Sequence, residues 1–166
     1  IFGLNEQFSA DTNPYKVNLG VGVYFDDAGK LPLLQCVRTA EKARADAPSA
    51  RGYLPIDGIV AYDAAVKNLV FGSDPALAER VATIQTLGGT GGLKIAADFL
   101  HRLNPSSKLL ISDPSWENHR AVFSTAGFEV GTYAYYDAAA RGIHTAGMLA
   151  DLEAAAPGTV VVLHAC

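Results

Sequence analysis

The sequence is short of cysteine, of positive charge and of long apolar runs, and each shortage excludes a class of protein. Two cysteines among 166 residues, Cys36 and Cys166, are too few for a disulfide framework or a cysteine-based metal site. A net charge of −4 argues against a basic face for nucleic acid. No apolar run approaches the roughly 20 residues that cross a bilayer, and polar residues interrupt the N-terminal segment where a signal peptide would lie. We therefore expect a cytoplasmic protein that binds no metal, nucleic acid or membrane.

Charged residues are also scarce. They make up 18% of the chain, against a usual share of about 25%, whereas hydrophobic residues make up 49%. A chain of this length has enough apolar side chains for one ordinary domain with a sizeable core. The low share of charge indicates that part of the surface faces another chain or another part of the same protein.

Apolar runs of strand length alternate with amphipathic stretches of helical length from residue 81 onward. The pattern predicts strands at 81–87, 108–112, 128–133 and 159–163, and helices at 90–103, 116–126 and 146–155. Ser115 is the expected N-cap of the helix at 116–126. Two earlier helices are predicted at 34–47 and 59–71, the second ended by Gly72. Strict alternation of this kind is typical of an α/β fold with a mainly parallel sheet covered by helices on both faces.

A glycine-rich turn, LGGTGG at 87–92, joins the first predicted strand to its helix. Unpaired N–H groups and the helix dipole make such a junction an anion site, and the Thr90 hydroxyl adds a donor. The dinucleotide motif fails because Lys94 occupies its sixth position, counted from Gly89. The triphosphate motif fails because Leu93 precedes Lys94 and Ile95 follows it. A structural glycine turn without a ligand remains an alternative for this segment taken alone.

The carboxyl ends of parallel strands meet at one edge of a sheet, where ligands bind. Trp116 and His119 follow the strand at 108–112, and His164 follows the strand at 159–163. Each has an ordinary structural interpretation, as a helix-start anchor for Trp116 and as hydrogen-bonded polar residues for the histidines. Their shared edge with the glycine turn favours a site for an anionic ligand that carries a flat ring.

Six segments then occur in an order that resembles the aspartate and aromatic amino-acid aminotransferases, which are pyridoxal-phosphate enzymes of fold type I. They are DTNPYKVNLGVGVY, YLPIDG, LGGTGGL, DPSWENH, YAYYD and VVLHAC. The resemblance implies that residues 33–166 form the first part of an incomplete pyridoxal-phosphate-binding large domain. Residues 1–32 would form an N-terminal arm and small-domain segment. The implied reaction is transamination of aspartate or aromatic amino acids with 2-oxoglutarate, in a homodimer.

The resemblance also implies roles for the residues at the sheet edge. Gly89 and Thr90 would hold the cofactor phosphate, and Trp116 would stack on the pyridine ring. His119 would orient the carboxylate that pairs with the ring nitrogen, and His164 would lie in the same hydrogen-bond network. These roles fit the physical properties of each side chain.

Two further roles lie outside this edge. Tyr53 would reach across the dimer interface to the partner subunit's phosphate, although an ordinary loop tyrosine is the simpler interpretation without the resemblance. Gly22 would approach the substrate carboxylate in a segment that closes over the site. Both roles rest on the resemblance alone.

The chain departs from the family in what it lacks. The Schiff-base lysine of the family lies in a Ser-x-Ser-Lys context, which none of the lysines here has; they are Lys16, Lys30, Lys42, Lys67, Lys94 and Lys108. Family members are about twice this length or more, as two ordinary domains require. We therefore expect a truncated piece with no catalytic residue of its own, inactive alone. The family sheet order further implies that the strand at 81–87 lacks its neighbours here and exposes an unpaired edge.

Two other hypotheses remain. The chain could be a non-enzymatic α/β domain that binds an anionic ligand or a partner through the GGTGG turn. It could also be a different nucleotide enzyme of the doubly wound class, which the two failed motifs disfavour.

Overall fold

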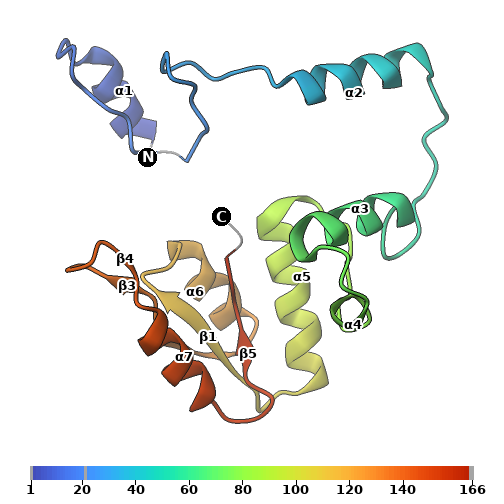
Figure 1. The fold of residues 1–166 in the computed structure, drawn as a ribbon, viewed down its shortest axis with the longest axis vertical. Helices are drawn as coiled ribbons and strands as arrows, with labels where there is room; N and C mark the ends of the chain where they lie inside the picture. The colour runs from blue at the N-terminus through green and yellow to red at the C-terminus, as the bar shows by residue number, and fades with distance from the viewer. Residues whose placement is uncertain (1, 21, 165–166) are drawn as a thin grey trace. The chain divides into compact units, whose positions relative to one another are not determined.

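The computed structural model describes residues 2–20 and 22–164. The chain divides into two compact units, residues 1–52 and residues 53–166. The elements of each unit are labelled in Figure 1. Among the described residues, none of the helices combines the length and the apolar character that a membrane crossing requires.

The first unit begins with a helix that the sequence pattern did not predict, α1 (Phe2–Ala10). Its C-terminal end is stabilised by Lys16, whose Nζ donates to the carbonyl oxygens of Phe8 (2.5 Å) and Asp11 (2.6 Å). A cation near a helix C-terminus also opposes the negative end of the dipole. The stabilising contact comes from outside the helix, and for that reason the local pattern did not predict α1.

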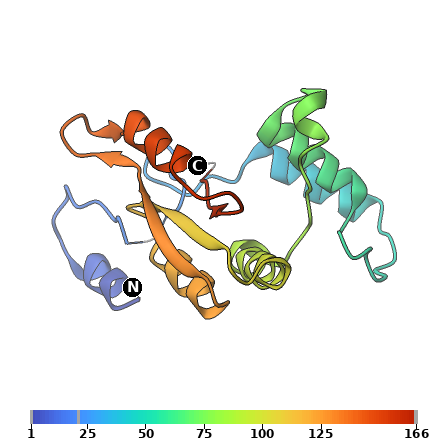
Figure 2. The same cartoon turned by 90° about the horizontal axis from the view of Figure 1, so that it is seen from below.

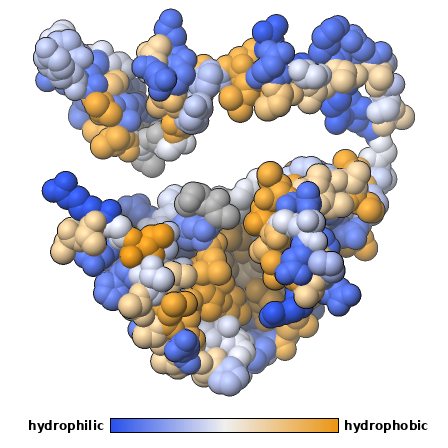
Figure 3. Space-filling model, in the orientation of Figure 1, coloured by the Kyte–Doolittle hydropathy of each residue, from blue (hydrophilic) through white to orange (hydrophobic). Residues whose placement is uncertain are grey.

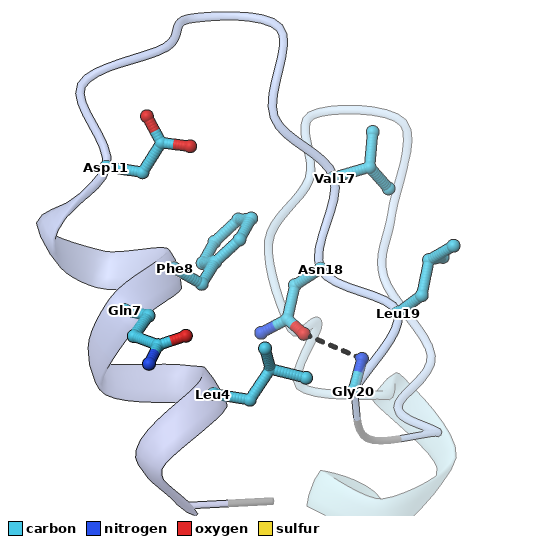
Figure 4. Close-up of a pocket in the computed structure, with 8 residues that line it drawn as sticks. All are labelled: Leu4, Gln7, Phe8, Asp11, Val17, Asn18, Leu19 and Gly20. Atoms are coloured by element: carbon cyan, nitrogen blue, oxygen red, sulfur yellow. Dashed lines mark hydrogen bonds between the residues drawn. The ribbon is translucent and has the colours of Figure 1, made fainter.

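Residues 17–20 run back along α1 and enclose a cavity of about 450 Å³ (Figure 4). Asn18 holds this return segment in place. Its amide nitrogen donates to Asn5 Oδ1 at 3.0 Å, and its Oδ1 accepts from the Gly20 N–H at 2.9 Å. The return segment is therefore extended but forms no sheet.

The helix α2 (Gln35–Asp46) completes the first unit and confirms the helix predicted at 34–47. Every residue of α2 is exposed. Its one ion pair joins Lys42 to Asp46 at 2.9 Å, and an exposed pair of this spacing contributes only about 0.2–0.5 kcal/mol. A helix of this length is marginal alone in water, so α2 depends on contacts beyond its own turns.

The second unit opens with α3 (Val60–Phe71) and the short α4 (Pro75–Ala78). Gly72 ends α3 as predicted, because its φ of 73° lies in the left-handed region that glycine enters without strain. Its N–H donates to the Asn68 carbonyl at 2.9 Å. Asp74 begins α4 by accepting from the Ala76 N–H at 2.9 Å.

A three-stranded parallel sheet forms the centre of the second unit. Its strands are β1 (Lys108–Asp113), β2 (Glu129–Ala134) and β5 (Val160–Val161), in the order β2-β1-β5. The register pairs Lys108 with Glu129 and Leu109 with Val160. A separate antiparallel pair, β3 (Tyr136–Asp137) and β4 (Gly142–Ile143), follows β2.

Helices cover both faces of this sheet, as predicted. Figure 2 shows α6 (Glu117–Thr125) and α5 (Gly88–Leu103) on one face and α7 (Thr145–Glu153) on the other. The buried core lies between β1, α5 and α6 and consists of Ala97, Leu109, Ile111, Phe123 and Phe128. The α/β class is therefore confirmed, and the structure shows its physical basis.

The strand predicted at 81–87 is wrong. Residues 81–86 belong to no helix or strand. The Gln85 N–H donates to the Asp57 carbonyl at 2.9 Å, but no ladder forms around this bond within the described residues. A strand requires a neighbouring strand, and sequence periodicity reports only how one segment alternates.

The predicted N-cap Ser115 is also wrong. The helix α6 begins after Trp116, and no side chain caps it. The Ser115 hydroxyl instead lies 2.8 Å from His119 Nδ1. The hydroxyl therefore contacts the imidazole ring of His119 in the first turn of α6 and not a backbone N–H group.

Candidate functional site

The glycine turn forms the first turn of α5, which begins at Gly88, two residues earlier than predicted. Gly88 has a φ of 69°, a conformation that glycine adopts without strain. Its N–H donates to the Thr86 carbonyl at 3.1 Å. No side chain caps this helix, so its first N–H groups are available to a ligand.

The outer side of this turn is open. A Cβ atom built on Gly88 or Gly89 would meet no atom within 4 Å apart from its chain neighbours and the backbone of α5 itself. The Thr90 side chain beside them is exposed. A Cβ on Gly92, by contrast, would lie 2.7 Å from Thr86 Oγ1 on the inner side. The turn therefore packs closely on one side and leaves room for an anionic group on the other.

Three rings meet beyond the carboxyl ends of β1 and β5. The centroid of His119 lies 5.3 Å from that of Trp116 and 4.8 Å from that of His164, and both pairs are edge-to-face. Figure 1 shows the amino end of α5 at this same end of the unit. The fold therefore brings together Trp116, His119 and His164, as the shared-edge argument predicts.

The environment of the histidines differs from that of the tryptophan. His119 is 8% exposed, whereas Trp116 is 48% exposed and offers a ring surface to a ligand. His164 Nε2 lies 3.5 Å from Ser112 Oγ. The buried His119 ring therefore lies between the half-buried His164 and the more exposed indole ring of Trp116.

Sequence reasoning missed the tyrosines and serines that support these rings. Tyr135 stacks on His164 with centroids 6.4 Å apart and an interplanar angle of 27°. The Tyr133 hydroxyl donates to the Val162 carbonyl at 2.8 Å. The available signal was the run of tyrosines in YAYYD, in which Tyr133 lies on β2 and Tyr135 lies just beyond its end.

The His119 pKa is lowered from its ordinary value of 6.5, first by burial and then by the charge of nearby His164. Burial disfavours the charged imidazolium, and a second histidine repels it. His119 is therefore neutral at pH 7, with Nδ1 in contact with the Ser115 hydroxyl.

This shift predicts a pH dependence of stability. Below pH 6.5 an unfolded His119 takes up a proton that the folded one still refuses, so the unfolded state is favoured as the pH falls. We expect the urea midpoint of the protein to fall between pH 7 and pH 5.5 by more in the wild type than in His119→Asn. An equal fall of the urea midpoint in both proteins would contradict the lowered pKa of His119. The same two proteins compared at pH 7.5 and 8.5 are the control, because the histidine is neutral there in the folded and unfolded states.

Two further expected site residues, Tyr53 and Gly22, are both exposed. Tyr53 is fully exposed at the start of the second unit. Gly22 belongs to the first unit, and a Cβ built on it would have no atom within 4 Å. Both are accessible for contacts with atoms that lie outside their own units. Cys166, the last residue of the VVLHAC segment, lies outside the described residues.

Lys94 is the lysine nearest to the turn in sequence, and it is engaged elsewhere. Its Nζ forms an ion pair with Asp98 one turn further along α5. The neighbouring segments place no second lysine at the turn, because Lys67 Nζ donates to the Ala78 carbonyl at 3.4 Å and Lys108 pairs with Glu129 at 3.2 Å. The described part of the chain also holds no group of three or more histidine, cysteine, aspartate or glutamate side chains arranged for a metal ion.

Comparison with known proteins identifies relatives across the whole chain. The chain is 58% identical over 168 residues to the aspartate aminotransferase of Pseudomonas aeruginosa. The match spans 100% of this chain and 42% of that protein. The chain is 47% identical over 169 residues to the aromatic-amino-acid aminotransferase of Escherichia coli, of which it covers 43%. The chain therefore spans less than half the length of these relatives.

Solved structures agree with these relatives. The crystal structure of the aromatic-amino-acid aminotransferase from Burkholderia pseudomallei, covalently bound to pyridoxal phosphate, matches with a TM-score of 0.84 and 64% identity. The match covers 99% of this chain and 42% of that one. The structure described here is thus an incomplete α/β domain of the aminotransferase type. The family model for aminotransferase class I and II matches residues 14–166, and the chain belongs to this family.

Proposed function

We propose that the full-length protein is a pyridoxal-phosphate-dependent aminotransferase. It acts on aspartate or aromatic amino acids with a 2-oxo acid such as 2-oxoglutarate, in the cytoplasm and as a homodimer. The observation that carries this proposal is the open, uncapped glycine turn of α5, which lies at the carboxyl end of the sheet (Figure 1), where the half-exposed Trp116 follows β1. The names of the relatives support it, and none of them supports a non-enzymatic binding domain.

The residues present fit part of the cofactor. The backbone N–H groups at Gly89 and the Thr90 hydroxyl would hold its phosphate, because no Cβ occupies the space in front of them. Trp116 would cover one face of its ring, and neutral His119 would orient the carboxylate that pairs with the ring nitrogen. When bound, the cofactor supplies the electron sink for the reaction.

The proposal assigns separate tasks to the two parts of the chain. Residues 1–32 form the arm and small-domain segment, in which Gly22 approaches the substrate carboxylate, and residues 33–166 begin the cofactor domain. Tyr53 reaches the phosphate held by the partner subunit. Its full exposure supports this role, because a loop tyrosine with no packing of its own is available to another chain.

The exposed apolar surface of the second unit supports a larger native domain. Figure 3 shows apolar residues in the hollow between α5 and the sheet. Ile95 and Phe99 of α5 and Leu163 beyond β5 are all more than half exposed. Large contiguous apolar surface marks a contact site. We propose that the rest of the protein covers this surface and supplies the cofactor-binding lysine.

Replacing Thr90 by valine tests the phosphate site in the full-length protein. The change removes a hydroxyl donor to a charged group, so the dissociation constant for pyridoxal phosphate is expected to rise about tenfold to hundredfold. Titration of the apoenzyme by absorbance measures this constant. Thr125→Val, the same change at an exposed position in α6, is expected to leave it unchanged. An unchanged constant in Thr90→Val would refute the assignment of this turn.

The choice of substrate requires kinetics on the full-length protein. The relatives carry both aspartate and aromatic-amino-acid names. Comparing kcat/KM for aspartate, tyrosine and phenylalanine decides between them, and turnover of none of the three would overturn the proposed function.

A further inference from the structure

Gln85 joins two segments of the second unit that lie far apart in sequence. Its N–H donates to the Asp57 carbonyl at 2.9 Å, and its Oε1 accepts from the Ile59 N–H at 3.0 Å. The glutamine therefore bonds to the backbone on both sides of Gly58. Both bonds end on backbone groups of residues 57 and 59, so they fix the path of the main chain in this turn.

Gly58 makes this contact possible. It is buried, and its φ is +104°, where a side chain is strained. A Cβ built on it would lie 2.3 Å from Gln85 Cβ and 2.9 Å from Gln85 Oε1. The Gly58 N–H closes a turn by donating to the Pro55 carbonyl at 3.0 Å. The side chain of Gln85 thus lies directly against a turn that has room for it only because residue 58 is glycine.

The position of Gln85 gives the contact its importance. It lies three residues before Gly88, in the segment 81–86 that has no strand partner within the described residues. Within the described residues, two hydrogen bonds join residues 82–87 to a segment distant in sequence, and Gln85 makes both of them. The course of the chain into the glycine turn is therefore held by this one residue, through one bond of its backbone and one of its side chain.

We propose that Gln85 is a positioning residue for the phosphate-binding turn. It sets the approach of residues 85–88 to α5 by bonding to the turn at 55–59, and this second segment also carries Tyr53 four residues before Asp57. A ligand phosphate at Gly89 and Thr90 would then be held by a turn whose geometry Gln85 maintains. The inference rests on the proposed function, because it assumes that the turn binds the cofactor phosphate.

Two substitutions separate the hydrogen bond from the packing. Gln85→Met keeps the length and flexibility of the side chain but removes the acceptor. Gln85→Glu keeps an acceptor for the Ile59 N–H at the amino end of α3, where negative charge is favoured. The glutamate variant should therefore restore the function that the methionine variant loses.

The experiment measures cofactor affinity rather than turnover, with apoenzyme of the full-length protein. Pyridoxal phosphate and pyridoxal, which lacks the phosphate, are titrated by absorbance against the wild type and both variants. We expect Gln85→Met to raise the dissociation constant for pyridoxal phosphate about tenfold and to leave that for pyridoxal within about twofold. Gln85→Glu should remain close to the wild type for both ligands.

The phosphate comparison distinguishes positioning from general stability. The inference is overturned if Gln85→Met raises the dissociation constants for pyridoxal phosphate and pyridoxal by the same factor. It is also overturned if both constants stay unchanged. If Gln85→Met does not fold, Gln85→Ala takes its place, because it removes the same acceptor without adding bulk against Gly58, and the same selective loss is expected. A wild-type apoenzyme that binds pyridoxal phosphate no better than pyridoxal would instead overturn the proposed phosphate site itself.

Discussion

The 166-residue chain, supplied with pyridoxal phosphate, aspartate and 2-oxoglutarate, is expected to show no transamination above the rate of the free cofactor. The lysine nearest to the phosphate turn, Lys94, pairs with Asp98 on α5, and no lysine has the sequence context of the family's cofactor-binding lysine. Covalent catalysis needs that amine both to bind the cofactor and to move a proton. Enzymes commonly gain a factor of about 10⁶ or more over the uncatalysed rate, so the difference is large.

The measurement couples formation of the 2-oxo acid product to a dehydrogenase assay. The full-length protein under the same conditions is the positive control, and the free cofactor without protein sets the baseline. Turnover by the short chain at a rate near that of the full-length protein would show that its own residues complete the site.

Replacing Leu109 by alanine is expected to produce the second large effect. Leu109 on β1 is 0% exposed and packs in the cluster that α5 and α6 cover. Truncation of a buried leucine removes its apolar contacts and leaves a cavity, at a cost of about 2–5 kcal/mol in the free energy of unfolding. Urea denaturation of the full-length protein, followed by circular dichroism, measures the shift.

Leu109→Met is the matched control at the same position. It nearly conserves the volume of the side chain, so its cost should be below about 1.5 kcal/mol. A loss under about 1 kcal/mol in Leu109→Ala would mean that the neighbouring elements collapse into the space, and that this cluster is not the centre of the core.

Local patterns predicted most of the elements in the second unit. The apolar run of β1 and the helical spacing of α5 and α6 survive in the structure, because these elements supply the apolar side chains of the buried core. Gly72 ended α3 for a reason that is local to one residue. The glycine turn was predictable for the same reason, because only its own composition and its place before a helix were needed.

The errors arose where the deciding contact lies elsewhere in the chain. The helix α1 is held by Lys16 from beyond its end, and the Ser115 hydroxyl is engaged by His119 rather than by the helix backbone. The segment at 81–86 has the alternation of a strand but no neighbouring strand to bond. A periodic pattern cannot report whether a partner is present.

By itself, the sequence determined the α/β class, the family and the residues that meet at the edge of the sheet, because these follow from periodicity, strand direction and short motifs. Only the tertiary structure decided that the His119 ring packs edge-to-face against both Trp116 and His164. It alone showed that Gln85 lies against Gly58 and bonds across a separation of 26 residues. These contacts depend on how side chains from distant segments fit together, and spacing along the chain carries no record of that fit.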